Sequence, residues 1–555
     1  MKKTLILLGV AALAVFASCK KEAPQDYLTL VSAPTEVIPV SGTEEPLAIV
    51  FNATKAWTAS VNAEVKDFVT LTPTSGEAGD NAKVKLTVAK NEVNEERTIV
   101  VTLKSEGLEP LKVTLTQASP DHFIVNPEGP VEVSKDGAQV TLSINTNCEY
   151  TVTDYHDGSF PWQSAVLSED KKTATVTIGA NTGYDPRQSY VKFTIPAIQV
   201  PALDEEGVPT GETKALEVRV YFNQAGLTTI SWTKTLPETF KNGTQLSMAK
   251  LGDNYFLYDG VSEPQKFNPS TGEITSAGII IPGGLAVTEV FNDDAGNFLV
   301  ATPVAYGSAF DVYVLEAGDT NLNDAEILIH AYFDYYGYGL GHFHARGDVL
   351  NDGIVTALIA DGPATGVPVT GAYWEISDGK ATTWAKYGET EEQTCQPTYI
   401  TFTTARGIDF PNRADFAPLG TSAAAGFLYD GYDGTYALQH YVGGTTTPLA
   451  TIGDSANGVT CIKTDLWGSK PIVALNNMSY FPQGAIPSKL TVYDATEMTP
   501  ITTVEILADG LEGAFMPDPY QSSCVLLEQK GDALIVFSAD GVQGLLQKIE
   551  IPAAN

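Results

Sequence analysis

The feature that most constrains the fold of this chain is a pattern of landmarks that occurs twice in its first 226 residues. In each copy an apolar-Asn pair is followed six residues later by an aromatic-Thr pair, an Asn then stands six residues before an Arg, and the copy ends in Gln-Ala. The landmarks are Phe51-Asn52, Trp57-Thr58, Asn91, Arg97 and Gln117-Ala118 in the first copy, and Ile144-Asn145, Tyr150-Thr151, Asn181, Arg187 and Gln224-Ala225 in the second. Landmarks that keep one order, about ninety residues apart, indicate a tandem duplication.

The pattern predicts that both copies are built from strands. Residues 83–88 and 98–103 alternate apolar and polar side chains for much of their length, as half-buried strands do. Turn residues recur about every ten positions, which is typical of a β-sandwich. The second copy carries an extra segment, residues 196–217, with Asp204-Glu205-Glu206-Gly207 near its centre. We expect this insertion to form a hairpin. Trp57, inside a strand, is expected to be a core residue rather than an exposed binding platform.

From about residue 227 the spacing changes, and short strand clusters recur roughly every 45 to 60 residues. Each cluster has a polar Gly/Asp/Asn turn, an apolar strand and a further alternating strand. The clusters begin near residues 252, 294, 351, 425, 470 and 531. One cluster cannot bury its own apolar face, whereas six arranged radially can, so the spacing predicts a β-propeller of about six blades, with five to eight allowed. Residues 228–236 could pair with the last cluster and close the ring. The expected fold class is therefore all-β, with two tandem sandwiches followed by a propeller.

The first nineteen residues have the layout of a secretory leader. Lys2 and Lys3 precede an apolar run, Leu5–Phe16, which is too short to span a bilayer core of ~30 Å. Ala17-Ser18-Cys19 resembles the lipobox of bacterial lipoproteins, although Phe16 stands where Leu is more usual. The resemblance implies a signal peptide over residues 1–18, a lipid on Cys19, a tether over residues 19–27 and an outer-membrane, cell-surface location. Ordinary secretion, with Cys19 incidental, is the alternative.

Charge and cysteine content narrow the function classes. The formal net charge is -34, which disfavours binding to nucleic acid and leaves the N-terminal lipid as the only expected contact with a membrane.

Cys148, Cys395, Cys461 and Cys524 form no CxxC pair and have no zinc-type spacing, so buried thiols are at least as probable as disulfides. No cofactor is expected. Ca²⁺ at the Asp/Gly-rich turn 429–434 is an alternative to a plain hairpin turn.

The duplicated landmarks resemble the BACON family, Ig-like sandwiches of Bacteroidetes surface and secreted proteins. An early Trp, a Ser-Gly turn, an Asn, an Arg and a closing Gln fit well over residues 28–119 and more loosely over residues 120–226, where Tyr150 replaces the Trp. The family name implies carbohydrate binding, while many members look like spacers. Residues 227–555 resemble, in architecture only, an uncharacterised propeller-like region that follows BACON domains in outer-surface lipoproteins.

Candidate ligand-binding residues are the aromatic and histidine side chains that crowd the Gly-rich segment 330–346 and a second cluster near residue 430. They are Tyr332, Tyr335, Tyr336, Tyr338, His342, His344, Trp374, Tyr429 and Tyr432. Aromatic rings on loops suit sugars, because a ring face packs on C–H groups while a hydroxyl bonds ligand hydroxyls. The alternative is that the Gly-rich segment packs across the ring as a plug. His342 and His344 lie two residues apart with no evident third ligand, which is a weak metal signal.

No catalytic residues stand out, since GxSxG, HExxH and P-loop motifs are absent from the sequence. The function expected from these observations is glycan binding without catalysis, beside a carbohydrate-uptake system with an outer-membrane transporter as partner. The alternatives are a propeller glycoside hydrolase or lyase on BACON spacers, which would need a pair of carboxylates on the central face, and a protein-binding adhesin or scaffold.

Overall fold

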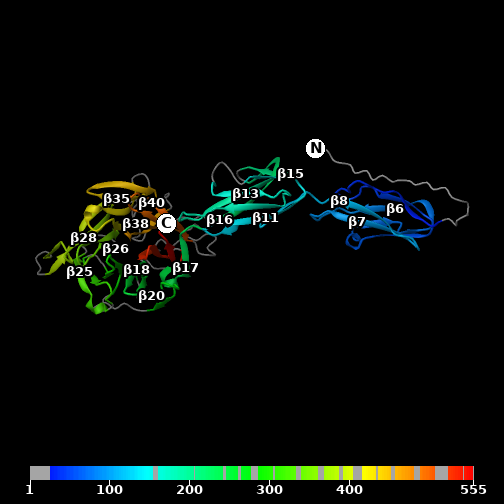
Figure 1. Ribbon diagram of the computed structural model, residues 1–555. Coiled ribbons are helices and arrows are strands. Elements are labelled where there is room, and N and C mark those ends of the chain that lie inside the picture. Colours follow the sequence, from blue (N-terminus) through cyan, green and yellow to red (C-terminus); the bar gives the residue numbers. More distant parts are fainter. Residues whose placement is uncertain are drawn as a thin grey trace. The chain divides into compact units, whose positions relative to one another are not determined.

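The computed structural model is all-β and has almost no helix (Figure 1). It describes residues 25–153, 160–204, 207–241, 246–260, 264–276, 286–303, 307–319, 321–332, 339–360, 368–386, 392–403, 415–432, 436–451, 457–479, 488–506, 523–541 and 543–553. Contacts divide the chain into two compact units, one of residues 1–130, 139–177 and 190–221 and the other of residues 131–138, 178–189 and 222–555. None of the helices in the described part has the length and hydrophobicity needed to cross a bilayer.

The first copy consists of two four-stranded antiparallel sheets over one apolar core. One sheet has the order β1 (Leu28–Ser32), β2 (Leu47–Ala53), β6 (Gly79–Val88), β4 (Val69–Thr72), and the other the order β5 (Ser75–Gly76), β3 (Trp57–Val61), β7 (Arg97–Ser105), β8 (Leu111–Gln117). The Trp57 side chain is only 5% exposed, and its ring lies edge-on to Phe51 with centroids 4.9 Å apart. Trp57 is therefore a core residue, as its position within a strand predicts.

The second copy also has two four-stranded sheets. Their orders are β10 (Val131–Val133), β16 (Pro209–Gln224), β15 (Arg187–Leu203), β12 (Thr151–Thr153), and β13 (Gln163–Leu167), β14 (Thr173–Ile178), β11 (Ala138–Thr146), β9 (Phe123–Asn126). Strands β15 and β16 are the longest of this copy, and they form the predicted hairpin of residues 196–217. Its turn is closed by main-chain bonds, from the Asp204 N–H to the Val208 carbonyl at 2.9 Å and from the Gly207 N–H to the Asp204 carbonyl at 3.1 Å.

The repeated Asn, Arg and Gln form a buried hydrogen-bond network, which we call the amide lock. In the first copy the Asn91 amide donates to the carbonyls of Glu95 (2.8 Å) and Ala118 (2.9 Å), while its oxygen accepts the Val93 N–H at 3.2 Å. Arg97 donates to the side chain of Gln117, whose amide donates to the Ala89 carbonyl at 2.8 Å. The lock satisfies main-chain groups at the end of the sandwich that no strand pairs.

The second copy repeats the amide lock with the matching residues. Asn181 donates to the carbonyls of Asp185 (2.9 Å) and Ala225 (3.1 Å) and accepts the Gly183 N–H at 3.0 Å. Arg187 donates to Gln224 at 2.8 Å, and Gln224 donates to the Gly179 carbonyl at 2.9 Å. The same three residue types therefore perform the same task in both copies, which explains why the duplication is visible in the sequence.

The described residues of the C-terminal unit form six antiparallel sheets of four or five strands each, in chain order. They are β18 (Ser247–Leu251), β19 (Asn254–Tyr258), β20 (Gln265–Phe267), β21 (Ile274–Ser276); β22 (Glu289–Asn292), β23 (Phe298–Ala301), β24 (Ala309–Leu315), β25 (Glu326–Tyr332); β26 (Gly339–Gly347), β27 (Gly353–Ala360), β28 (Pro368–Ser377), β29 (Lys380–Ala381) with β32 (Thr398–Thr403) on β28; β33 (Phe416–Pro418), β34 (Phe427–Tyr432), β35 (Tyr436–Val442), β36 (Thr445–Thr451); β37 (Asn457–Trp467), β38 (Lys470–Ser479), β39 (Ser488–Asp494), β40 (Thr499–Ile506); and β41 (Ser523–Lys530), β42 (Ala533–Asp540), β43 (Leu545–Ile551), β17 (Thr229–Thr235). A separate hairpin joins β30 (Trp384–Lys386) to β31 (Gln393–Cys395), and a short helix, α1, covers Glu238–Lys241.

Two observations link these sheets in a cycle. The first strands contact one another in the order β18, β22, β26, β33, β37, β41 and back to β18. The last sheet takes its outer strand, β17, from the start of the unit, with Thr229 opposite Glu550 and Thr235 opposite Leu545. Pairing between the two ends of the unit is the closure that the sequence of residues 228–236 predicts.

One matching position on or next to each first strand carries a buried side chain, and we call these six positions the axial ring. At four of them the side chain bonds to the next strand of the cycle. The Ser247 hydroxyl accepts the Val290 N–H at 3.2 Å, and the Glu289 carboxylate accepts the Phe343 N–H at 3.0 Å. The Asp415 carboxylate accepts the Ile462 N–H at 2.6 Å, and the Cys461 thiol lies within hydrogen-bonding reach of the Val525 N–H. Each N–H belongs to the residue that follows the matching position, so the ring consists of Ser247, Glu289, His342, Asp415, Cys461 and Cys524.

Candidate functional site

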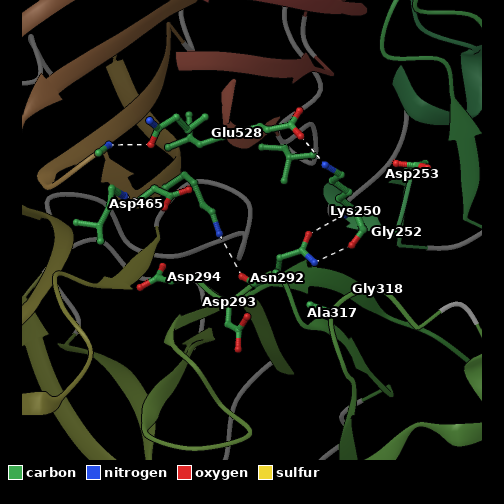
Figure 2. Close-up of a pocket in the computed structure, with 17 residues that line it drawn as sticks. Lys250, Gly252, Asp253, Asn292, Asp293, Asp294, Ala317, Gly318, Asp465 and Glu528 are labelled. Atoms are coloured by element: carbon green, nitrogen blue, oxygen red, sulfur yellow. Dashed lines mark hydrogen bonds and ion pairs between the residues drawn. The ribbon is translucent and has the colours of Figure 1, made fainter. Parts of the chain in front are cut away.

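One hollow in the described part of the C-terminal unit lies where several of the first strands end. Its volume is about 590 Å³, and Figure 2 shows it surrounded by polar side chains from several sheets. Strands β18 and β22 contribute residues at their ends and in the turns that follow them, and strands β37 and β41 contribute residues from the middle of each strand to its end. The lining residues are Lys250, Gly252, Asp253, Asn292, Asp293, Asp294, Gly296, Ala317, Gly318, Lys463, Asp465, Leu466, Gly468, Leu526, Leu527, Glu528 and Gln529. We call this hollow the terminal pocket.

One wall of the terminal pocket is held by a charged cluster between β18 and β41. Lys250 forms an ion pair with Glu528, whose other oxygen accepts the Tyr255 hydroxyl at 2.7 Å. Burial and the neighbouring Glu528 carboxylate raise the pKa of Tyr255, so this phenol stays protonated and donates. Figure 2 shows the Lys250–Glu528 pair closing one side of the hollow. The charge of Glu528 is therefore already neutralised within the protein.

Asn292 fixes the main chain of Lys250. Its oxygen accepts the Lys250 N–H at 2.7 Å, and its amide donates to the carbonyls of Lys250 (2.8 Å) and Asn297 (3.0 Å). These bonds join the ends of β18 and β22 and hold the Lys250 side chain at the edge of the pocket. Asn292 thus positions the wall, and both hydrogens of its amide are used within the protein.

Two of the carboxylates that line the pocket are used by the fold. Asp294 accepts two bonds from the Arg346 guanidinium, at 2.7 and 2.9 Å, and one from the Gly347 N–H at 2.8 Å. Asp293 is buried and accepts three N–H groups from Asn297 and Val349 at 2.7 to 2.9 Å. Burial raises the pKa of Asp293, and these donors oppose that rise. Both aspartates are expected to shape the turns rather than bind a ligand.

Strand β37 presents the groups that are best placed to meet a ligand. Lys463 and Asp465 lie two residues apart, so both side chains point to the same face of the strand and line the pocket together. Asp465 accepts the Leu466 N–H at 2.7 Å, and Lys463 makes a long contact, 3.5 Å, to the Asn292 carbonyl. Burial raises the pKa of Asp465, and the charge of Lys463 opposes that rise. Asp253 adds an exposed carboxylate from the turn after β18.

The residues singled out from the sequence lie elsewhere. His342 belongs to the axial ring, and the Nε2 atom of the buried His344 lies 2.7 Å from Asp415 Oδ1. Trp374 is fully buried, and its indole N–H donates to the Cys395 carbonyl at 2.8 Å. Tyr429 is 2% exposed and packs on Phe402. The prediction that Trp374 and Tyr429 present ring faces to a ligand is therefore corrected, because both rings fill the space between neighbouring sheets.

Other predicted residues are half-exposed or lie outside the described residues. The Tyr332 hydroxyl donates to Glu392 at 2.9 Å, and Glu392 also contacts His330. Tyr335, Tyr336 and Tyr338 lie outside the described residues, as do Cys19 and the side chain of Tyr432. Within the part of the chain that the structure describes, no group of three or more His, Cys, Asp or Glu side chains is placed to hold a metal ion. The four cysteines beyond Cys19 are free thiols.

Comparison with known families finds two matches along the chain. Residues 227–549 match the family "Domain of unknown function (DUF8500)", and because this match covers more than half of the chain, the protein belongs to that family. Residues 56–118 match the BACON family, described as "Putative binding domain, N-terminal". The resemblance of the first copy to BACON domains is thereby confirmed. No curated protein matches the chain in sequence.

Solved structures show only distant likenesses. The chain is 11% identical to a lignostilbene dioxygenase of Pseudomonas brassicacearum, with 64% of this chain and 80% of the other covered at a TM-score of 0.31. The computationally designed Ika8 protein is 12% identical, with 70% of this chain and 97% of the other covered at a TM-score of 0.26. A GH5 xyloglucanase of Bacteroides ovatus is 14% identical, with 39% of this chain and 34% of the other covered at a TM-score of 0.15. This chain therefore spans about a third of the length of that enzyme. TM-scores this low establish no shared fold.

Proposed function

We propose that the protein is a lipid-anchored, cell-surface lipoprotein of the Bacteroidetes type whose C-terminal unit is a six-bladed β-propeller that binds a glycan in the terminal pocket. The propeller assignment is supported by six sheets whose first strands contact one another in a cycle and by the pairing of β17 with β43. Two Ig-like sandwiches would serve as the stalk, the first of them the BACON domain.

The single observation that carries the glycan proposal is the presence of Lys463 and Asp465 in one hollow of about 590 Å³. A sugar hydroxyl both donates and accepts, so a pocket that offers an ammonium donor beside a carboxylate acceptor can bind neighbouring hydroxyls. The volume falls within the range of about 300–1,000 Å³ that ligand sites occupy. A ligand without net charge fits best, because both signs of charge line the same wall.

The binding test uses the purified full chain on a glycan array, followed by calorimetry with the sugars that are retained. We expect Lys463→Ala and Asp465→Asn each to weaken binding by about tenfold, the equivalent of one charge-assisted hydrogen bond. The matched controls are Lys489→Ala and Glu505→Gln, which remove an exposed ion pair on β39 and β40 and should leave affinity unchanged. If the control variants weaken glycan binding as much as the pocket variants, or if the array retains no sugar, the proposal that the terminal pocket binds a glycan is wrong.

The same experiment separates binding from hydrolysis. Asp465 and Glu528 line one hollow, and burial raises the pKa of Asp465, which are features that a glycoside hydrolase also needs. Binding without release of reducing sugar supports a binding protein. Release of reducing sugar that disappears in both Asp465→Asn and Glu528→Gln would instead assign a hydrolase.

The anchor and the location form a separate part of the proposal, supported by the sequence of the leader alone. Metabolic labelling with a fatty acid should mark the native chain and fail to mark Cys19→Ser, which should also appear in the soluble fraction. Protease treatment of intact cells should then cleave the native protein if it faces outward. Co-purification of an outer-membrane transporter with the native chain would support a role in carbohydrate uptake, whereas a protein ligand in place of a glycan would favour an adhesin.

A further inference from the structure

A second hollow of about 360 Å³ lies beside the terminal pocket and shares residues with it. Its lining residues are Tyr184, Trp467, Gly468, Lys470, Gln529, Asp532 and Ala553, and Gly468 and Gln529 also line the terminal pocket. All of these residues belong to one compact unit. We call the second hollow the aromatic annex. Two adjoining hollows with a common wall can hold consecutive parts of one ligand.

The wall between the two hollows is fixed by hydrogen bonds. The Gly468 N–H donates to the Gln529 side-chain oxygen at 2.9 Å, and the Gln529 amide donates to the Gly531 carbonyl at 2.8 Å. Gly468 has a φ of +66°, and no atom lies within 4 Å of the place where a Cβ would stand. The glycine therefore leaves open space above the wall, so an extended ligand can cross from one hollow to the other.

The annex offers apolar ring surface that the terminal pocket lacks. Trp467 and Tyr184 are both half-buried, and their ring centroids lie 6.4 Å apart at an interplanar angle of 65°. The Trp467 indole N–H donates to the Asp532 carbonyl at 2.8 Å, which fixes the ring against the turn between β41 and β42. A fixed aromatic ring whose N–H is already satisfied offers its face, which packs well on the C–H side of a sugar.

We propose that the ligand is a chain of at least two sugar units, with one unit in the terminal pocket and the next on Trp467 in the aromatic annex. This inference rests on the proposed function, because the terminal pocket supplies the polar end of the site. Strand β37 links the two parts, since Asp465 lines the pocket and Trp467 lines the annex two residues later. Affinity should therefore rise with chain length and then level off once both hollows are filled.

The test is calorimetry on the full chain with ladders of cello-, xylo-, manno- and malto-oligosaccharides from one to six units. For the ladder that binds, we expect the second unit to raise affinity about three- to tenfold, the value of one aromatic contact. Trp467→Ala should remove this gain and leave monosaccharide binding unchanged, while Trp467→Phe should retain part of it. Asp465→Asn should weaken binding at every chain length.

Each outcome decides between the two proposals. A monosaccharide that binds as well as its oligomers would overturn the chain-length inference and leave the proposed function standing. Binding to no ladder would overturn both. Because the Trp467 N–H also holds Asp532, Trp467→Ala could unfold, in which case Tyr184→Ala provides the second variant and must reduce the gain from the second unit. If both Trp467→Phe and Tyr184→Ala keep the full gain with an unchanged melting temperature, the annex does not bind sugar.

Discussion

The amide lock and the axial ring solve the same problem with different side chains. Both satisfy main-chain groups that lie beyond the hydrogen bonds of the sheets, one at the end of a sandwich and the other between neighbouring sheets. The two amide locks use identical residues, with Asn91 matched by Asn181 and Gln117 by Gln224. The six positions of the axial ring hold five residue types, Ser, Glu, His, Asp and Cys.

The difference follows from what each position must do. Asn91 donates two bonds and accepts one, and only a carboxamide does both with this geometry. An axial position that bonds to the next strand only has to accept one N–H from that strand, which a hydroxyl, a carboxylate or a thiol can do. A position that only one residue type can satisfy keeps that residue after duplication, so the repeat stays visible in the sequence. A position that several residue types can satisfy does not.

The largest effect is expected from Asp415→Ala. Asp415 is fully buried and accepts bonds from the Ile462 N–H, the Phe416 N–H and the His344 ring. Removing the carboxylate takes from all three donors the acceptor that they share. This loss should cost about 3–5 kcal/mol of stability in the C-terminal unit. Hydrogen exchange should show lost protection in β33 and β37 and unchanged protection in β7 and β8.

Asp415→Asn provides the control for that experiment, because it retains the shape and one acceptor oxygen. Asp415→Asn should therefore lose less stability than Asp415→Ala. If Asp415→Ala leaves protection in β37 intact, the axial ring does not hold the sheets together, and the comparison with the amide lock fails.

A somewhat smaller effect is expected from Asn91→Ala. The substitution frees the carbonyls of Glu95 and Ala118 and the N–H of Val93, and should cost about 2–3 kcal/mol in the first sandwich. Asn91→Asp should cost nearly as much, since a carboxylate cannot donate, and Asn181→Ala should repeat the loss in the second copy. Asn94→Ala, an exposed neighbour, serves as the matched control for chemical denaturation. Equal stability of Asn91→Asp and the native chain would show that donation is unimportant.

Much of the fold could be predicted from residues whose environment is reflected in local pattern. The alternation of residues 83–88 predicts a half-buried strand, the insertion at 196–217 predicts a hairpin, and residues 228–236 predict a pairing with the end of the chain. The proposed binding site was harder to predict. Lys463 and Asp465 look like the solvated face of a strand, because sequence alone does not show that the ends of four strands converge there.

The predictions for Trp374 and Tyr429 failed for a related reason. Trp374 and Tyr429 stand on strands, and a strand in a ring of sheets is covered on both faces, so its large side chains are buried between neighbours. A Trp at a strand end, such as Trp467, keeps part of its ring exposed. For these three residues, position within the strand decides how far the ring is exposed.

Acid should distinguish the two devices, because the amide lock does not titrate below neutral pH and the axial ring does. Burial would raise the pKa of Asp415, but His344, His342 and the Ile462 N–H hold it below its ordinary value of 3.8. The unfolded chain therefore binds more protons as pH falls below about 4, and the stability that Asp415 contributes is complete above that pH and lost below it. Protection factors measured at pH 7 and pH 3 should fall more in β33 and β37 than in β7 and β8. An equal fall in both regions would contradict the distinction.

The smallest effect on stability is expected at Cys461, where replacing the residue separates the need for an acceptor from the need for good packing. Burial raises the pKa of this thiol, so it is neutral and acts as a small acceptor for the Val525 N–H. Cys461→Ser retains an acceptor and should cost less than about 1 kcal/mol, whereas Cys461→Val fills the space without one and should cost about 1–2 kcal/mol. Packing alone predicts the opposite order, because valine is the better residue in an apolar core and a buried hydroxyl is costly. Denaturation midpoints that place serine above valine would thus show that the axial ring selects for an acceptor rather than for a particular residue.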